Sequence, residues 1–386
     1  MKFAMIGILG GGQLGRMLAQ AAQRMGMSVA ILDPDPDSPA IQIAQRYVIG
    51  SFRDPAKIRK LAQGCDVVTT EIEHVDVETL EALEQSGINV QSPSRTIRII
   101  QDKFGQKVYL AQHNIPLPAF CDIPNVEAAY RAAETFGFPF VLKAKRLAYD
   151  GRGNYVVRNL EDIPLAMASF GAADLYAEQW VPFTKELAVM VARSIDGQIA
   201  VYPVVETVQV DNICHTVIAP AQISPAIAAA ASEIARAAVA SLEGVGIFGV
   251  ELFLLPDDSL LLNEIAPRPH NSGHYTIEAC VTSQFEQHIR AITRLPLGDP
   301  AMRVPAAIML NLIGQATSQA TEMQMDAAIS LPEAAFHWYG KRELRPGRKL
   351  GHVTVTGLSL ADVARKMTPL TNLTEQTDLS VGKRLH

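Results

Sequence analysis

The stretch IFGVELFLLPDDSLLLNEIA, residues 247–266, predicts a β-hairpin and decides how the rest of the chain is interpreted. Two apolar, strand-forming runs flank the turn PDDS at residues 256–259. If the two middle residues of that turn form the loop, its first and last residues face each other. Counting outward from them sets Glu251 directly opposite Glu264, with both side chains on one face of the sheet.

Opposed carboxylates in an apolar setting need an explanation, because like charges directly opposite each other destabilise a sheet. A hard divalent cation between them would convert repulsion into binding. Mg²⁺ typically takes one or two carboxylates together with water and phosphate oxygens. This interpretation predicts a magnesium site at Glu251 and Glu264, and the alternative is a pair of solvated acids on an edge strand.

A second signal is a lysine inside an apolar strand. Lys143 interrupts the run FPFVLKAK (138–145), and the polar glycine loop YDGRGN (149–154) follows it. A buried lysine needs an anionic partner, and a glycine-rich loop beside it can close over a polyphosphate and exclude water. The alternative is a lysine on an edge strand next to an ordinary turn.

Two further polar clusters lie in the second half of the chain. The loop RPHNSGH (268–274) directly follows the hairpin, and its proline and glycine argue against a helix. Its two histidines, four residues apart, are therefore a poor zinc pair, and the loop suits a small oxyanion better. Five cations in the nine residues KRELRPGRK (341–349) favour a clamp for a phosphate monoester, or else a solvated basic face.

The first 93 residues alternate strands and helices, which is typical of a doubly wound parallel sheet. The strand FAMIGIL (3–9) leads into the motif GGGQLG (10–15), where the amides of a helix N-terminus can approach an anion. Asp33 ends the next strand, where an acid that binds ribose is expected. The motif fits a dinucleotide, another phosphate or ligand, or plain tight packing of the turn.

Composition narrows the classes of function. The 386 residues suffice for two or three domains, and 34 Lys and Arg against 40 Asp and Glu give a net charge of −6. That sign argues against binding nucleic acid or an anionic membrane through a whole basic face. The four cysteines are scattered, which excludes a disulfide framework or zinc cluster and fits reduced thiols in a cytoplasmic protein. We recognise no signal peptide and no uninterrupted apolar run that could span a bilayer.

The middle and end of the chain give a coarser pattern. The sequence predicts one helix over about 94–113, a strand over 198–205 and an amphipathic helix over 225–242. After residue 296 it predicts a mixed tail with short strands and one helix.

One set of ligands accounts for most of these clusters. A lysine, a flexible glycine lid and a carboxylate pair suit ATP with Mg²⁺, and no G-x-x-x-x-G-K-[ST] P-loop occurs. A separate cationic clamp implies a second, phosphorylated substrate. The combination predicts ATP-dependent ligation. The rival class is an NAD-dependent dehydrogenase, which explains the glycine motif and Asp33 only; a non-catalytic nucleotide sensor is a third possibility.

The sequence resembles the ATP-grasp superfamily and, within it, the 5-(carboxyamino)imidazole ribonucleotide synthases of purine biosynthesis. The segments that carry this resemblance are GGGQLGRM (10–17), TTEIEHV (69–75), YDGRGN (149–154), LLNEIAPRPHNSGH (261–274), SQFEQHIRAI (283–292) and HWYGKRELRPGRKLGH (337–352). The resemblance implies an ATP-grasp fold of mixed α/β and α+β class. Its parts are a Rossmann-like (pre-ATP-grasp) domain at 1–93, an ATP-grasp domain at 94–295 with a lid subdomain at about 115–180, and a small C-terminal domain at 296–386.

The resemblance also implies an activity. ATP and bicarbonate would form carboxyphosphate, whose carboxyl group passes to 5-aminoimidazole ribonucleotide, giving 5-(carboxyamino)imidazole ribonucleotide, ADP and phosphate. A homodimer is implied as well. The nearest competitor among ATP-grasp enzymes is a formate-dependent glycinamide ribonucleotide transformylase.

The resemblance assigns roles residue by residue. ATP binding falls to Lys103, Lys143, Tyr149, Asp150, Gly151, Arg152, Gly153, Asn154, Glu178, Gln179, Trp180, Val181, Glu186, Gln209, Asn263 and Glu264, with Glu178 and Val181 on the adenine and Glu186 on the ribose. Glu251 and Glu264 would hold Mg²⁺. Bicarbonate and carboxyphosphate would lie among Arg268, His270, Asn271 and Ser272. Aminoimidazole ribonucleotide would contact Gln13, Leu14, Glu73, Asn271, Lys341, Arg348 and Lys349.

The chain departs from the family pattern at the lid. Ala148 stands where a glycine is usual, and Asn154 where a glutamine is usual. A Cβ at position 148 restricts the backbone and is expected to change the flexibility of the lid. No residue is identified as the base that would deprotonate the amine, with Glu73 and His270 the candidates.

Overall fold

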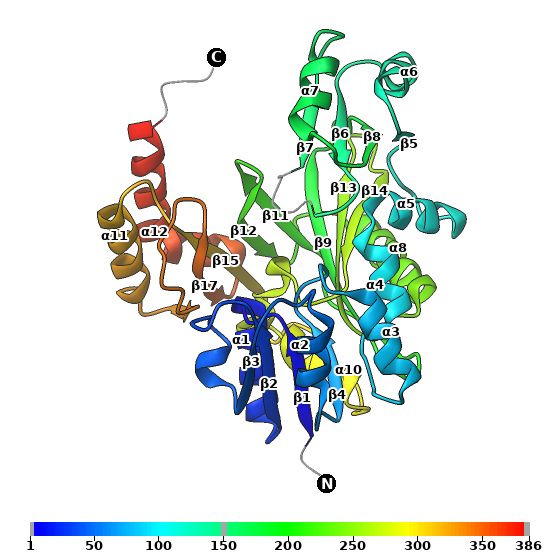
Figure 1. Ribbon diagram of the computed structural model, residues 1–386. Helices are drawn as coiled ribbons and strands as arrows, with labels where there is room; N and C mark the ends of the chain where they lie inside the picture. The colour runs from blue at the N-terminus through cyan, green and yellow to red at the C-terminus, as the bar shows by residue number, and fades with distance from the viewer. Residues whose placement is uncertain (1–3, 148–152, 382–386) are drawn as a thin grey trace.

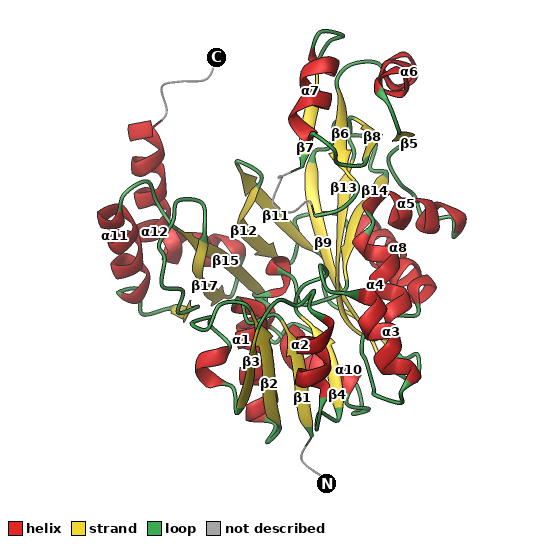
Figure 2. Ribbon diagram, in the orientation of Figure 1, coloured by secondary structure: helices red, strands yellow, loops and turns green. Residues whose placement is uncertain are grey.

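The structure, a computed structural model, describes residues 4–147 and 153–381, with side chains described up to residue 370. The described residues form three β-sheets with helices packed around them (Figures 1 and 2).

The amino-terminal sheet is parallel, with strand order β3-β2-β1-β4. Its strands are β1 (Met5–Leu9), β2 (Ser28–Asp33), β3 (Arg46–Ile49) and β4 (Val67–Thr70), and its helices are α1 (Gln13–Arg24), α2 (Pro55–Ala62) and α3 (Val77–Gln85). Helix α1 packs with Ile6 and Ile8 on one face, while α2 and α3 pack with Leu9 and Leu32 on the other. The predicted doubly wound arrangement is confirmed.

A small antiparallel sheet projects from the molecule at the top of Figure 1, in the order β5-β8-β6-β7. It consists of β5 (Phe120–Ile123), β6 (Phe140–Ala144), β7 (Asn154–Val157) and β8 (Leu175–Gln179), with helices α6 (Val126–Phe136) and α7 (Asp162–Phe170). Lys143 lies directly opposite Asn154 in the β6–β7 pair.

The largest sheet runs from the middle of the chain into its C-terminal part, in the order β14-β13-β9-β11-β12-β15-β17-β16 with β10 beside β9. Its strands are β9 (Lys185–Arg193), β10 (Ile199–Val201), β11 (Val205–Val210), β12 (Ile213–Ala219), β13 (Gly246–Leu254), β14 (Leu260–Ala266), β15 (Ala306–Ile313), β16 (Ala334–Trp338) and β17 (Lys349–Gly357). The pairing of β12 with β15 makes the sheet continuous across residue 296.

The remaining helices cover these sheets. They are α4 (Ser94–Gln101), α5 (Lys103–Gln112), α8 (Pro225–Leu242), α9 (Thr276–Ala279), α10 (Gln284–Ile292), α11 (Ser318–Ile329) and α12 (Leu360–Val381), with a 3-10 turn at Asn271–Gly273.

The hairpin of β13 and β14 confirms the predicted pairing but corrects the predicted turn. Glu251 pairs with Glu264, yet Leu254 pairs with Leu260. Leu255 N–H donates to the carbonyl of Ser259 at 3.0 Å, so the loop has three residues, 256–258, rather than two. The offset of one residue is made up by a bulge at Asn263, which lies unpaired between the two registers. A bulge re-aims the side chains beside it.

Three other expectations were wrong in detail. The helix expected over 94–113 divides at Asp102, whose extended backbone ends α4 and whose carboxylate accepts the N–H of Gly105 at 2.8 Å to start α5. The strand expected over 198–205 is two strands, because Pro203 between β10 and β11 has no N–H for the ladder. The described part of the tail holds two helices, α11 and α12, rather than one. Helix α11 was not predicted because its apolar periodicity is weak.

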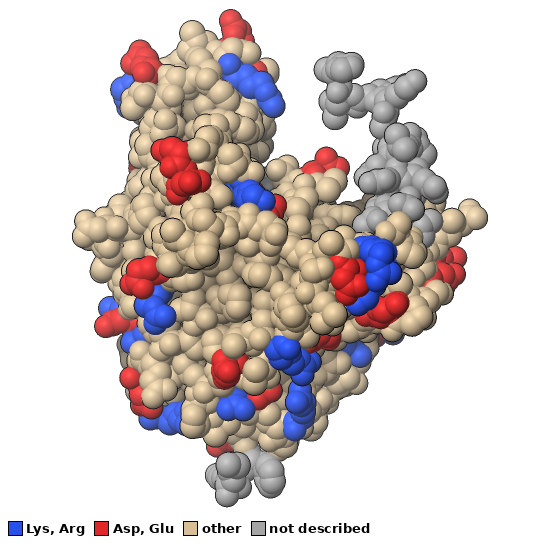
Figure 3. All heavy atoms as spheres, turned by 180° about the vertical axis from the view of Figure 1, so that it is seen from behind, with Lys and Arg blue, Asp and Glu red and all other residues tan. Residues whose placement is uncertain are grey.

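Helix α8, predicted as amphipathic, is the one helix among the described residues with the length and hydropathy of a membrane span. Its alanine-rich face packs in the same core cluster as Val189 and Val250 of the large sheet, so it serves as a core helix. All four cysteines lie among the described residues, and none of them forms a disulfide. On the face seen in Figure 3, cations and anions are interspersed rather than gathered into one basic surface.

Candidate functional site

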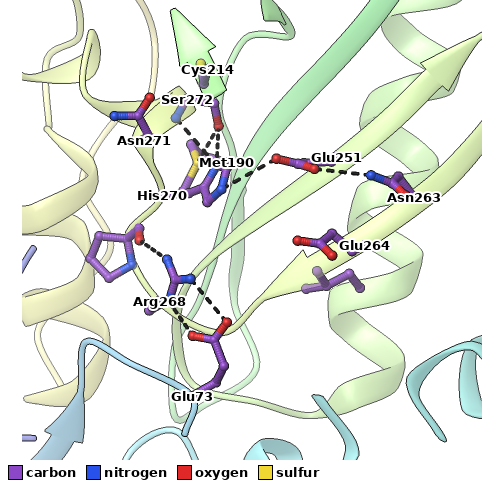
Figure 4. A network of polar contacts seen from close by, with 12 residues as sticks. Glu73, Met190, Cys214, Glu251, Asn263, Glu264, Arg268, His270, Asn271 and Ser272 are labelled. Carbon is purple, nitrogen blue, oxygen red and sulfur yellow. Dashed lines mark hydrogen bonds and ion pairs between the residues drawn. The ribbon is translucent and has the colours of Figure 1, made fainter. Parts of the chain in front are cut away.

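The carboxylates of Glu251 and Glu264 lie on the side of the sheet that carries Arg268 and His270 (Figure 4). Asn263, at the bulge, donates its side-chain N–H to Glu251 Oε2 at 3.3 Å, and His270 Nε2 lies 3.5 Å from Glu251 Oε1. The bulge thus brings an amide to the acid pair.

The positive charge beside the acid pair is too small to neutralise both carboxylates. Burial, together with the charges of Glu264 and Glu186, raises the pKa of Glu251 to about 8. Burial would raise the pKa of Glu264 too, but the ion pair with Lys103 lowers it. The opposite directions of the two pKa shifts mean that the pair favours one negative charge over two, as expected for two close carboxyl groups.

Two lysines enclose Glu178 at the junction of the small and large sheets. Lys143 Nζ lies 2.9 Å from Glu178 Oε2, and Lys107 Nζ lies 3.1 Å from Oε1. Although burial would raise the pKa of Glu178, the two ammonium groups lower it to about 2. Lys107 also donates to the backbone carbonyl of Asn263 at 3.0 Å, so it links this triad to the acid pair. The predicted anionic partner of Lys143 is Glu178.

Arg268 forms a two-pronged ion pair with Glu73, with Nε–Oε2 at 2.6 Å and Nη2–Oε1 at 3.2 Å (Figure 4). Burial would raise the pKa of Glu73, but the guanidinium lowers it to about 2. A carboxylate held ionised in this way is a weak base at neutral pH, which argues against Glu73 as the proton acceptor.

The loop after Arg268 is fixed from two sides. His270 Nδ1 shares a hydrogen bond with the hydroxyl of Ser272 at 2.8 Å. Asn271 exchanges two side-chain hydrogen bonds with Asn311 of β15, at 2.9 and 2.6 Å, and Asn311 also donates to the carbonyl of Cys214 at 2.9 Å. Both amide side chains are buried, so strand β15 positions the loop.

The backbone amides of the glycine motif are already hydrogen-bonded to carboxyl groups of the protein. Gly12 and Gly15 donate their N–H groups to Glu71 at 2.7 and 2.8 Å, and Gly11 donates to Asp33 at 2.7 Å. Burial raises the pKa of Glu71 to about 7 against the lowering effect of the two amides. The amides that would hold a pyrophosphate are already bonded, which argues against the NAD-dependent dehydrogenase.

The predicted ribose and adenine residues lie along β8, the segment after it, and β9 to β11. Burial raises the pKa of Glu186, and a hydrogen bond with Gln209 partly offsets that rise. Gln179 ends β8, and Trp180 follows it with 42% of its surface exposed. Glu178 faces the two lysines, so its predicted contact with adenine stays a prediction, as does that of Val181 in the following segment.

The residues predicted to bind aminoimidazole ribonucleotide include the start of α1 and the cationic clamp (residues 341–349). Gln13 and Leu14 open α1. Within the clamp, Lys341 Nζ donates to the carbonyl of Lys349 at 2.7 Å, while Arg348 lies 3.5 Å from Glu343. The lid residues Ala148, Tyr149, Asp150, Gly151 and Arg152 lie outside the described residues. Gly153 directly precedes β7, and Asn154 is its first residue.

Three residues that position the site were not predicted from the sequence. Lys107 lies one turn after Lys103 on α5, which was a usable signal once the helix was divided at Asp102. Glu71 and Asn311 carried no local signal, because their partners lie 56 and 40 residues away in the chain.

Comparison with known families agrees with this geometry. Residues 3–101 match the ribonucleotide synthetase preATP-grasp domain, residues 108–285 the ATP-grasp domain, and residues 307–366 the phosphoribosylaminoimidazole carboxylase C-terminal domain. The N5-carboxyaminoimidazole ribonucleotide synthase of Synechococcus elongatus is 45% identical over 91% of this chain and 89% of its own length. The chain belongs to that family. Its members convert aminoimidazole ribonucleotide, ATP and bicarbonate to N5-carboxyaminoimidazole ribonucleotide in purine biosynthesis.

Solved structures of the family extend the likeness to the whole fold. Carboxyaminoimidazole ribonucleotide synthase from Aspergillus clavatus in complex with ATP is 44% identical and covers 97% of this chain and 99% of its own, with a TM-score of 0.93. The Aspergillus enzyme in complex with ADP and 5-aminoimidazole ribonucleotide gives a TM-score of 0.92. The expected ATP-grasp fold, and membership of an ATP-dependent ligase family, are confirmed.

Some relatives are longer than this chain. The phosphoribosylaminoimidazole carboxylase of Vigna aconitifolia, named chloroplastic, is 48% identical over 93% of this chain, which spans 65% of the length of that relative.

The Arg268–Glu73 pair predicts a pH dependence of stability. Glu73 has a lower pKa in the folded protein, so its stabilising effect is complete above its ordinary pKa of about 4.5 and is lost as the pH falls toward 2. In urea titrations, the free energy of unfolding of the wild type should lose about 2 kcal/mol more than that of Glu73→Gln between pH 5 and pH 3. Glu243→Gln, which removes an exposed ion pair with Arg95, is the control. Its free energy of unfolding should fall between pH 5 and pH 3 by as much as that of the wild type. Parallel curves for wild type and Glu73→Gln would contradict this account.

Proposed function

We propose that the chain performs the family reaction with its own residues. ATP and bicarbonate react to carboxyphosphate, and the carboxyl group passes to the exocyclic amine of 5-aminoimidazole ribonucleotide. The observation that carries this proposal is the acid pair Glu251–Glu264 with Lys103 beside it, next to the loop 268–274.

The acid pair fits a magnesium ion. It offers hard oxygen donors, and the raised pKa of Glu251, caused by burial and by the charges of Glu264 and Glu186, supports a place for a cation there. Glu251 and Glu264 would hold Mg²⁺, with Asn263 beside them. Bound there, the ion would neutralise charge on the phosphates of ATP. Lys103 and Lys143 would contact the same phosphates, which supports positioning and charge stabilisation as the main catalytic contribution.

The loop after β14 supplies the donors for bicarbonate. In the first step a bicarbonate oxygen bonds to the γ-phosphorus and ADP leaves. Arg268, His270, Asn271 and Ser272 would surround the anion, and their fixed hydrogen bonds support a preorganised site. In the second step the amine nitrogen bonds to the carboxyl carbon and phosphate leaves. Because Glu73 is held ionised by Arg268, His270 is the better candidate for the base.

The phosphorylated substrate would lie between the glycine turn and the cationic clamp. Gln13, Leu14 and Glu73 would line the imidazole and ribose, and Lys341, Arg348 and Lys349 would bind the phosphate. The occupied amides of the glycine turn support a role in which the turn presents Gln13 and Leu14 rather than binding phosphate itself.

Assembly and location stay predictions. The homodimer implied by the resemblance can be tested by light scattering in solution. The expected cytoplasmic location does not follow from the family, because a plant relative is named chloroplastic.

Omitting each substrate in turn tests the proposed reaction. In a coupled assay of ADP release, ATP turnover should require both bicarbonate and 5-aminoimidazole ribonucleotide. Replacing these with formate and glycinamide ribonucleotide should give no turnover. Turnover with that second pair would establish the transformylase instead, and ATP binding without turnover in any mixture would favour a nucleotide sensor.

The acid pair can be tested by one conservative substitution. Glu264→Gln keeps the size of the side chain but removes its charge and replaces one acceptor oxygen with a donor NH2 group, so ATP turnover should fall about 100-fold. The fold, followed by circular dichroism, should stay intact. Asp257→Asn makes the same chemical change at the exposed tip of the same hairpin and should keep wild-type turnover. Wild-type activity in Glu264→Gln would refute the metal role.

The clamp can be tested through its effect on one substrate. Lys341→Ala removes a charge-assisted bond to phosphate, so the KM for aminoimidazole ribonucleotide should rise about 10- to 100-fold while the KM for ATP stays nearly unchanged. Arg345→Ala, which removes a cation of the clamp that pairs with Glu343, is the matched control. An unchanged ribonucleotide KM in Lys341→Ala would argue against the clamp.

A further inference from the structure

A second cluster of ligating side chains lies where α9 meets the C-terminal strands. One potential ligand atom from each of Glu278, His337 and His352 lies within 4.8 Å of the others. His337 pairs directly with His352 in the β16–β17 ladder, so both imidazoles emerge on one face. Glu278 Oε1 lies 2.7 Å from His337 Nε2.

The cluster contains buried polar atoms that are not satisfied. Tyr339 bonds His352 through Nδ1 at 2.9 Å, which leaves His352 Nε2 without a hydrogen-bond partner among the described residues. Glu278 Oε2 and His274 Nε2 are likewise unpartnered within the described chain, and the ring of His274 lies 4.8 Å from that of His352. His352 is fully buried. Because buried polar atoms are normally bonded, three such atoms in one place call for a ligand.

We propose that Glu278, His337 and His352 form a binding site for a divalent transition metal, with Zn²⁺ as the best-suited ion. Two imidazoles and one carboxylate are a donor set that zinc takes with a fourth position left open. His274 lies close enough to support the site. The donors also distinguish it from the acid pair, since Mg²⁺ prefers oxygen ligands.

The site has a route of entry and the freedom to adjust. The side chain of His337 is 27% exposed and lines a surface pocket together with Met17, Arg24 and Ile277. The rings of His337 and His352 are stacked, with centroids 4.4 Å apart and planes 11° apart. A shared ion therefore requires one ring to turn, and His337, at the edge of the pocket, is the ring that can do so.

The proposed ion would join two parts of the molecule. Glu278 lies on α9, just after the loop 268–274, whereas His337 and His352 lie on the C-terminal strands. A metal bound across them would fix the C-terminal strands against the segment that carries the bicarbonate residues. Since such an ion binds the folded state only, it should raise the Tm.

The test measures metal binding by the full chain after removal of metal with a chelator. Titrations with Zn²⁺, and with Co²⁺ followed by absorption, are made in excess Mg²⁺ to occupy the acid pair. We expect one equivalent of Zn²⁺, a tetrahedral Co²⁺ spectrum and a raised Tm. Glu278→Gln and His337→Asn should each weaken binding at least about tenfold. His113→Asn, an exposed histidine elsewhere, and Glu264→Gln, in the acid pair, should leave it unchanged.

Two results would overturn the proposal. One is a wild-type chain that binds neither Zn²⁺ nor Co²⁺ under these conditions. The other is binding that persists in both Glu278→Gln and His337→Asn, because the ion would then lie elsewhere. If both variants fail to fold, the wild-type Co²⁺ spectrum decides alone: tetrahedral coordination supports the site, and octahedral coordination by oxygen refutes it.

Discussion

Mutual repulsion between Glu251 and Glu264 is the constraint on which the rest of the site depends. The two acids face each other across β13 and β14, and the ion pair with Lys103 neutralises only one charge. The raised pKa of Glu251 is the direct result, because burial and its acidic neighbours disfavour a second charge. A pair in this state would exchange a proton for the proposed magnesium ion, so binding of that ion would depend on the ionisation of the pair.

The same strands connect the site to distant parts of the chain. Because β12 pairs with β15, the sheet that carries the acids also carries Asn311, whose amide holds Asn271 in the loop proposed to bind bicarbonate. Lys107 makes a similar connection on the other side, since it contacts both Glu178 and the bulge at Asn263. Groups proposed to bind three different substrates are thus held by one hydrogen-bonded framework.

Local patterns in the sequence predicted the parallel sheet and the hairpin, the family resemblance predicted the ATP-grasp fold, and non-local contacts account for the errors. The pairing of Glu251 with Glu264 was predicted through a two-residue loop, and it holds only because a bulge at Asn263 compensates for a three-residue loop. That bulge is fixed by Lys107 and by the bond from Leu262 N–H to the carbonyl of Pro116, on a segment remote in sequence. Turn propensities contain no information about such partners.

The glycine motif also has a partner that is remote in sequence and that the local pattern does not predict. GGGQLG has the spacing of a dinucleotide site, and its amides do bind an acidic group, but that group is the side chain of Glu71, just after β4. A Cβ at Gly12 would lie 2.8 Å from that carboxylate, so the glycines make room for an internal side chain. The motif therefore specifies backbone amides that need a negative charge. Whether a ligand or the protein supplies that charge depends on a residue that the motif does not include.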